Sequence, residues 1–272
     1  IFISPKFSTL LKANQNFNEN ILLKSDSLAL HQSYKTAEEF LVEELHKTSN
    51  KKNKFLILAQ LCSISKNSHK IEKTIHYGIK VLDENFNEFI NLESYGDVLY
   101  NLSVGMYRRG DVDSTFFYAK KALANRRKYL DSNHTKTIQN LIALGSFYKK
   151  IGNYETSIDY TNEALKLALN LNPLNYNSLV STYFSLGSLN QAMFNYKEAR
   201  ENYDTALSYY KDSLATNMEF KGHVYNAIGV ILEKEKDFAS ALNYYDQAIA
   251  IFKQSKNTLL TSIAYDNKAN VY

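Results

Sequence analysis

The side chains that could carry out chemistry are few, and their spacing does not suit it. The six histidines include no His-x-x-x-His pair, and the single cysteine, Cys62, cannot form the Cys-x-x-Cys pairs of zinc sites. Glycine-rich phosphate loops and the Gly-x-Ser-x-Gly turn of a nucleophilic serine are missing from the sequence. Distant residues can still converge in space, but the sequence predicts no enzyme, no metal site and no cofactor.

Composition favours a helical protein and gives no sign of a nucleic-acid or membrane partner. The 272 residues are 44% hydrophobic and 22% charged, and two prolines and nine glycines are too few for the many turns of a β-sandwich or barrel. The net charge of +4 is mild and the lysines are scattered, so no nucleic-acid partner is expected. No apolar run is long enough to span a membrane.

The compartment is indicated only by weak signals. One cysteine fits a reducing compartment such as the cytoplasm, which is the expectation here. The chain does not begin with methionine, and Ile1-Phe2-Ile3-Ser4-Pro5 is similar to the tail of a removed export signal. An exported or periplasmic location is therefore the alternative.

An internal repeat of 42 residues organises most of the chain. Leu144-Gly145, Leu186-Gly187 and Ile228-Gly229 follow one another at this period, and Leu102-Ser103 precedes them by one period. Nine residues after each small residue stands an aromatic or apolar one: Val112, Tyr154, Tyr196 and Phe238. Each unit then closes on Ala122-Leu123, Ala164-Leu165, Ala206-Leu207 or Ala248-Ile249. Such periodicity predicts a solenoid of stacked units.

Each unit reads as two antiparallel helices joined by a tight turn. Within each half the apolar residues are three or four apart, as on one face of a helix. Between the halves lie short turn sequences: Arg109-Gly110-Asp111, Ile151-Gly152-Asn153, Phe194-Asn195 and Lys236-Asp237. A small residue in the first helix, such as Gly187, predicts a close crossing with the second helix.

These residues resemble the tetratricopeptide repeat (TPR), whose first helix carries a Leu-Gly pair and whose second carries Ala-x-x-Tyr-x-x-Ala-Leu. The usual tryptophan is replaced by Leu99, Leu141, Tyr183 and Tyr225. The period exceeds the usual 34 residues and is similar to that of kinesin light chains and of arrays attached to caspase-like CHAT proteases. The resemblance implies an all-α, right-handed α-α superhelix with repeats at 96–137, 138–179, 180–221 and 222–261.

The two ends fit the repeat less well. Residues 55–95 are expected to be a diverged repeat in which Cys62 takes the small, packed position. Residues 1–54 are expected to be a helical cap or a further diverged repeat, with one helix from Ser25 to Lys47. Residues 262–272 read as the first helix of an incomplete repeat, whose stripe of Ala264, Tyr265, Ala269 and Tyr272 predicts that the natural protein continues, or self-associates there.

In such arrays the first helices line a concave groove, which predicts where a partner binds. Fourteen residues are candidates for this peptide-binding groove: Tyr100, Asn101, Val104, Arg108, Gln139, Ile142, Ser146, Lys149, Lys150, Phe184, Ser188, Gln191, His223 and Asn226. By resemblance to kinesin-type arrays, Asn101, Asn226 and Asn267 would contact a peptide backbone. Arg108, Lys149 and Lys150 are expected to lie near one another and to favour an acidic and apolar peptide.

The expected function is that of a protein- or peptide-binding scaffold, which would be the interaction module of a larger bacterial regulator or protease. Two alternatives remain at this point. One is a self-contained peptide-sensing receptor, which would need an output domain that residues 1–54 do not resemble. The other is a structural, self-assembling array.

Overall fold

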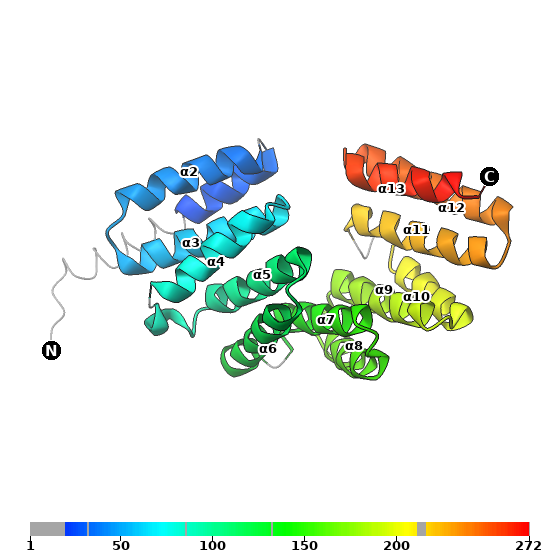
Figure 1. Ribbon diagram of the computed structural model, residues 1–272, viewed down its shortest axis with the longest axis horizontal. Coiled ribbons are helices and arrows are strands. Elements are labelled where there is room, and N and C mark those ends of the chain that lie inside the picture. Colours follow the sequence, from blue (N-terminus) through cyan, green and yellow to red (C-terminus); the bar gives the residue numbers. More distant parts are fainter. Residues whose placement is uncertain (1–19, 32, 85, 132, 211–215, 272) are drawn as a thin grey trace. The chain divides into compact units, whose positions relative to one another are not determined.

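The computed structural model describes residues 20–271, except 32, 85, 132 and 211–215, as helices joined by short connections (Figure 1). Within these residues there is no β-strand. The chain divides into two compact units, Ile1–Leu130 and Asp131–Tyr272. Each unit is a stack of antiparallel helix pairs, so the predicted all-α repeat fold is confirmed.

The first unit is built around an aromatic core. Residues 20–31 are helical and precede α2 (Tyr34–Lys47), α3 (Lys51–Asn67), α4 (Ile71–Asp83), the 3-10 turn η1 (Asn87–Phe89), α5 (Glu93–Arg109) and α6 (Val112–Tyr129). Helices α3 and α4 form one pair, and α5 and α6 the next. Phe55 of α3 is fully buried, with its ring centroid 5.6 Å from that of Phe86 and 5.3 Å from that of Phe89.

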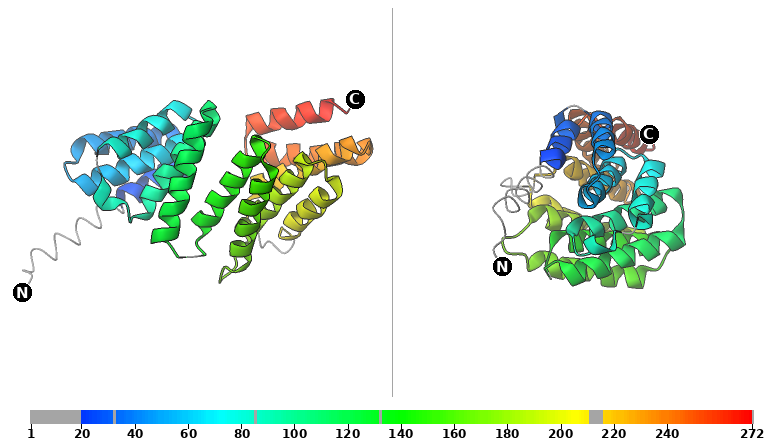
Figure 2. Two further views of the ribbon diagram at one scale, coloured as in Figure 1. Left: turned by 60° about the horizontal axis from the view of Figure 1, so that its bottom comes forward. Right: turned by 90° about the vertical axis from the view of Figure 1, so that its left-hand side faces the viewer.

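The second unit contains three helix pairs and one further helix. Its elements are α7 (Thr135–Lys150), α8 (Tyr154–Leu169), α9 (Tyr176–Ala192), α10 (Tyr196–Ser208), α11 (Met218–Lys234), α12 (Phe238–Gln254) and α13 (Thr258–Ala269). Figure 2 shows the helices of this unit packed side by side, and α7 and α11 both contact α9. Helices α7, α9 and α11 are called the first helices of the unit from here on.

The turns within the four helix pairs from α5 to α12 share one backbone form. One residue in each turn has a positive φ, at Gly110, Gly152, Phe194 and Lys236. This conformation suits glycine best and carries a steric cost for other residues, so Phe194 and Lys236 are held there by the helices on either side. The next residue caps the second helix in three of the turns, where Asp111, Asn153 and Asp237 accept a backbone hydrogen bond.

The small residues of α5, α7, α9 and α11 allow the predicted close crossing. All four are buried: Ser103, Gly145, Gly187 and Gly229. A β-carbon at Gly187 would lie 2.5 Å from Cε1 of Tyr203, and one at Gly229 would lie 2.6 Å from Cε1 of Tyr245. Because a carbon atom needs more than 3 Å, each glycine makes room for a tyrosine ring of the second helix.

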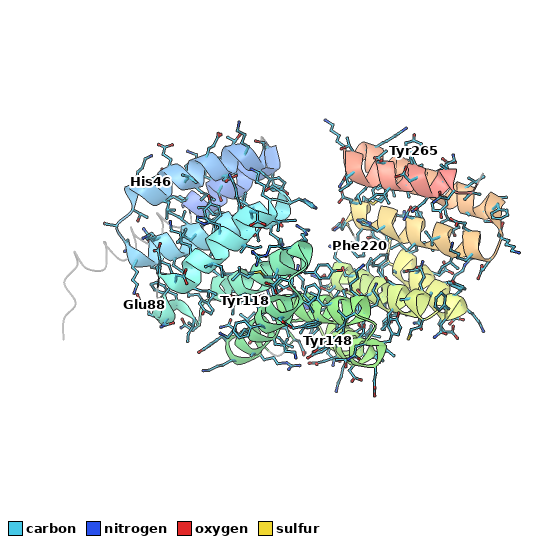
Figure 3. The ribbon with its side chains drawn as sticks, in the orientation of Figure 1. His46, Glu88, Tyr118, Tyr148, Phe220 and Tyr265 are labelled. Atoms are coloured by element: carbon cyan, nitrogen blue, oxygen red, sulfur yellow. The ribbon has the colours of Figure 1, made fainter. Side chains whose placement is uncertain are left out.

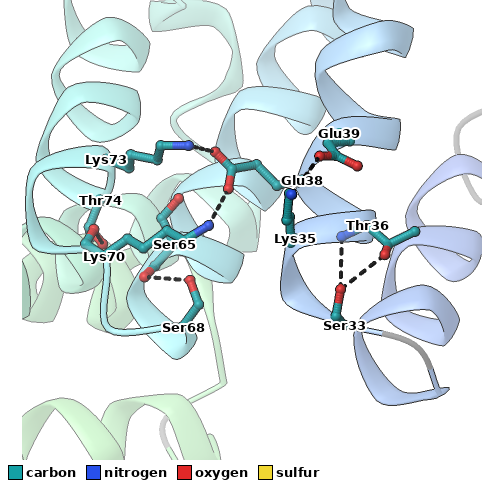
Figure 4. Close-up of polar contacts among 10 residues, drawn as sticks. All are labelled: Ser33, Lys35, Thr36, Glu38, Glu39, Ser65, Ser68, Lys70, Lys73 and Thr74. Atoms are coloured by element: carbon teal, nitrogen blue, oxygen red, sulfur yellow. Dashed lines mark hydrogen bonds and ion pairs between the residues drawn. The ribbon is translucent and has the colours of Figure 1, made fainter.

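The single helix predicted from Ser25 to Lys47 is wrong. Ser33 has an extended backbone, with φ −169° and ψ 158°, and its hydroxyl accepts a hydrogen bond from Thr36 N at 3.1 Å (Figure 4). Serine side chains favour this N-cap arrangement over a helix interior, so a new helix begins at Tyr34. In the helix that begins there, Tyr34 is 41% exposed, whereas Ala37 and Leu41 are fully buried.

A buried carboxylate connects α2 to α4. Glu38 of α2 is 6% exposed and pairs with Lys70 and Lys73 of α4 (Figure 4). The distance from Lys70 Nζ to Glu38 Oε2 is 2.7 Å. Burial raises the pKa of Glu38, but the hydrogen bonds from the two lysines outweigh it and leave the pKa below its usual value.

The helices begin three or four residues before the predicted repeat limits, at Glu93, Thr135, Tyr176, Met218 and Thr258. The predicted open stripe on the last helix is wrong at Ala264, which is fully buried against the preceding pair, while Tyr265 is 45% exposed. The suggested export tail and Tyr272 lie outside the described residues.

Candidate functional site

Most of the predicted contact residues lie along one face of the first helix of each pair, three or four residues apart. Three of them are exposed: Arg108, Gln139 and Lys150. Ten are partly buried: Tyr100, Val104, Ile142, Ser146, Lys149, Phe184, Ser188, Gln191, His223 and Asn226. Asn101 is 3% exposed beside Cys62, so its assignment to a contact surface is wrong. Asn101 follows Tyr100 by 100° around the helix and therefore points into the packed interior.

A polar network crosses the second unit from α7 to α10. The Lys149 ammonium of α7 donates a hydrogen bond to the Ser188 hydroxyl of α9. One turn further along α9, Gln191 Oε1 accepts a hydrogen bond from the Tyr203 hydroxyl at 2.9 Å. Tyr203 belongs to α10, so its ring passes over Gly187 and its hydroxyl reaches the face of the first helices.

Lys149 is the unusual member of this network. It is partly buried, and within the described residues it forms no ion pair. Burial lowers its pKa, and the positive charge of Lys150 lowers it further. A partly buried ammonium whose direct partner is a neutral hydroxyl attracts an anionic group from outside.

Aromatic rings lie beside the polar network. The Phe184 ring centroid of α9 is 5.5 Å from that of Tyr203 and 5.1 Å from that of Phe220 of α11. Figure 3 labels Phe220 at this position. The contacts continue from Phe220 to His223 and from His223 to Phe252 of α12. Burial lowers the pKa of His223, which favours its neutral form and extends the apolar character of this row.

Amide and carboxylate groups complete the face at α11. Asn226 Oδ1 accepts a hydrogen bond from Asn267 Nδ2 of α13 at 3.0 Å. Glu233 Oε2 accepts one from the Tyr245 hydroxyl at 3.0 Å, which repeats the Tyr203–Gln191 contact one period later. The Glu233 carboxylate also pairs with Lys234 at 3.4 Å, so the face of the second unit changes along the stack from a lysine at α7 to a paired carboxylate at α11.

The corresponding face of the first unit centres on Tyr100. The Lys66 ammonium of α3 lies 5.7 Å from the ring centroid of Tyr100, and the Arg126 guanidinium of α6 lies 4.9 Å from it. Arg126 is 1% exposed and pairs with Asp97 at 2.9 Å. Arg108 Nη1 donates a hydrogen bond to the Lys66 carbonyl at 3.1 Å.

Three residues that contribute to these faces were not predicted from the sequence: Lys66, Arg126 and, through its hydroxyl, Tyr203. Arg126 and Tyr203 belong to second helices, which were expected only to support the groove. Lys66 precedes Arg108 by 42 residues, a signal that the divergence of residues 55–95 from the repeat obscured. Arg108 lies in the first unit, and Lys149 and Lys150 lie in the second, so their expected proximity stays a prediction.

The described residues contain no group of three or more histidine, cysteine or acidic side chains that could hold a metal ion. No helix in the same part of the chain is long and apolar enough to cross a membrane. Cys62 is fully buried, and burial raises the pKa of its thiol to about 12. The thiol therefore stays protonated at neutral pH, in keeping with the predicted packing role.

The fold defines a helical repeat protein. Two segments of the second unit, residues 138–171 and 178–254, match family profiles described as tetratricopeptide repeat. Residues 138–171 and 178–254 are therefore tetratricopeptide repeats. No curated protein has significant sequence similarity to it.

Several solved structures share the fold. NprR in complex with its cognate peptide NprX is 16% identical, with a TM-score of 0.71, and the match covers 94% of this chain and 74% of that one. The apo form of RapI is 15% identical, with a TM-score of 0.67 and coverages of 94% and 70%. The TPR-like repeats of a putative kinesin light chain from Podospora anserina are 13% identical, with a TM-score of 0.54 and coverages of 74% and 96%.

Proposed function

We propose that this chain is a non-enzymatic interaction module that binds a peptide on the first-helix face of its second unit. The observation that carries the proposal is Lys149, a partly buried cation that forms no ion pair with any residue the structure describes, on the same face as the Phe184 ring. If this face were an ordinary solvent-exposed surface, we would expect the Lys149 ammonium to extend into water. The peptide bound by NprR, a protein of the same fold, supports the same type of ligand.

The face suggests which peptide would bind. An acidic side chain would pair with Lys149 and Lys150, and an apolar side chain would pack against Phe184. The Gln191 amide is held at its oxygen by Tyr203, which orients its nitrogen as a donor for a peptide carbonyl. The charges set the speed of association and its salt dependence, and the ring and the amide set the specificity.

Reversing the two lysines should weaken binding of an acidic peptide. The probe is the tightest-binding sequence selected by the whole chain from a random peptide library. We expect Lys149→Glu/Lys150→Glu to raise its Kd about tenfold or more, because two attractive charges become repulsive at the contact. Isothermal titration calorimetry at 0.15 M salt would measure the change.

The matched control is Lys166→Glu/Lys197→Glu. These lysines are exposed on the second helices α8 and α10, and the substitution changes the net charge by the same amount. The control should bind nearly as the unaltered protein does, because charges beyond the Debye length of about 8 Å are screened. Equal losses in both variants, or a library that yields no binder, would contradict the proposal.

A peptide-sensing receptor is the context that one observation favours. NprR was crystallised with a cognate peptide, and its match extends over 94% of this chain rather than over one repeat. The other context is an interaction module attached to a regulator or protease. The complete reading frame of the natural gene separates these two contexts, because an adjoining output domain or protease domain would be visible in it.

A further inference from the structure

Lys66 of the first unit forms no ion pair within the described residues, although the charge of Asp97 acts on it. Lys66 is partly buried in the last turn of α3, and in the described part of the chain its ammonium makes no hydrogen bond and no ion pair. Burial lowers its pKa, and the charge of Arg108 lowers it further. A lysine in this position often stabilises the carbonyl end of its helix. Here Arg108 already donates a hydrogen bond to the Lys66 carbonyl, so the ammonium is not needed for that purpose.

Positive charge is in excess around Tyr100. Lys66 and Arg126 lie against the ring, Arg108 is hydrogen-bonded to the Lys66 carbonyl, and the Asp97 carboxylate is engaged by Arg126 at 2.9 Å. The charge of Glu93 also acts on Arg126. A partly buried lysine beside two guanidinium groups lowers the stability of the folded protein, because like charges repel in a poorly solvated place. A bound negative charge would offset this repulsion.

We propose that Lys66, Tyr100 and Arg108 form a site for a carboxylate group of a peptide. Lys66 and Arg108 would donate charge-assisted hydrogen bonds to the carboxylate oxygens, and Tyr100 would pack against the neighbouring carbon atoms. Arg126 is too deeply buried to touch a ligand and adds to the positive potential from below. The site lies in the first unit, and it rests on the proposed function only in taking the ligand to be a peptide.

Small probes test the site without a library peptide. The complete protein, labelled with ¹³C at its lysine side chains, would be titrated at constant ionic strength with N-acetyl-aspartate amide and with N-acetyl-leucine. The first probe offers a side-chain carboxylate and the second a terminal one. N-acetyl-asparagine amide is the neutral control, and inorganic phosphate tests for an anion of another kind. The Lys66 signal is assigned by its loss in Lys66→Met.

We expect a saturable shift of the Lys66 signal with at least one carboxylate probe and none with the neutral control. Arg108→Gln, at an exposed position, should weaken that binding about fivefold, the effect of one exposed charge. The thermal midpoint of Lys66→Met should equal or exceed that of the unaltered protein, because a poorly placed cation has been removed.

Three results would overturn the inference: no saturable shift with either carboxylate, a shift with phosphate alone, or a lower midpoint for Lys66→Met, which would assign Lys66 to the fold. These results are distinct from a failure of the proposed function. A library without binders to the second unit would leave a carboxylate site at Lys66 standing. Conversely, if the Lys66 signal did not shift with either carboxylate, binding of a peptide at Lys149 would not restore the inference about Lys66.

Discussion

Replacing Phe55 by alanine should lower the free energy of unfolding by about 3–5 kcal/mol, the usual cost of removing a buried aromatic ring. Phe55 is fully buried, and its centroid lies between 5.3 and 6.5 Å from those of Phe86, Phe89 and Tyr95. Phe86 and Phe89 belong to the connection between α4 and α5, so the ring holds that connection against α3. Urea denaturation followed by circular dichroism would measure the loss.

Phe117→Ala is the matched control for this prediction. Phe117 belongs to α6 of the same unit but is 52% exposed, so the same substitution should change the stability by only about 0.5 kcal/mol. If both variants lost equal stability, the aromatic cluster at Phe55 would not be the core of the first unit.

Gly187→Leu should destabilise the second unit by about 1–3 kcal/mol or more through overpacking. Even the β-carbon would lie 2.5 Å from the Tyr203 ring, and the rest of the leucine side chain has no space between α9 and α10. Leucine is a better helix former than glycine by nearly 1 kcal/mol, so a stability loss would come from the crossing and not from the helix itself. The thermal midpoint should fall accordingly.

A double-mutant cycle identifies the partner in this clash. Gly187→Ala introduces only the β-carbon, and Tyr203→Leu removes the ring that this carbon would strike. The double variant should be more stable than the sum of the two single effects predicts, by at least about 0.5 kcal/mol. The account would be contradicted if the two single effects were strictly additive, or if Gly187→Leu left the thermal midpoint unchanged. Either result would mean that Gly187 does not lie at the crossing of α9 and α10.

Features that depend on neighbours in the sequence could be predicted. The short motif Ile151-Gly152-Asn153 predicts both the turn at Gly152 and the N-cap at Asn153. The 42-residue period predicts the equivalent N-cap at Asp237, two repeats later. The close crossing at Gly187 follows in the same way, because a small residue that recurs inside a helix needs a packing reason. Periodicity therefore identifies the helix pairs and the helix face on which a partner could bind.

Features that depend on contacts between helices could not be predicted. The helix face that carries Tyr100 and Arg108 follows from spacing, but its neighbours Lys66 and Arg126 come from α3 and α6. The burial of Asn101 depends likewise on where α3 packs. At Ser33 a local signal was present, an N-cap serine, but the continuous apolar pattern on both sides concealed it.

The most direct test of peptide binding by the first helices is the position of a bound peptide. The library-selected peptide would be made with a photoreactive benzoylphenylalanine at each position in turn, cross-linked to the complete protein, and mapped by mass spectrometry. We expect the cross-links to fall on α7, α9 and α11 of the second unit, next to Ile142, Phe184 and Gln191. Cross-links concentrated on the second helices α8 and α10, or scattered over the surface, would contradict the account.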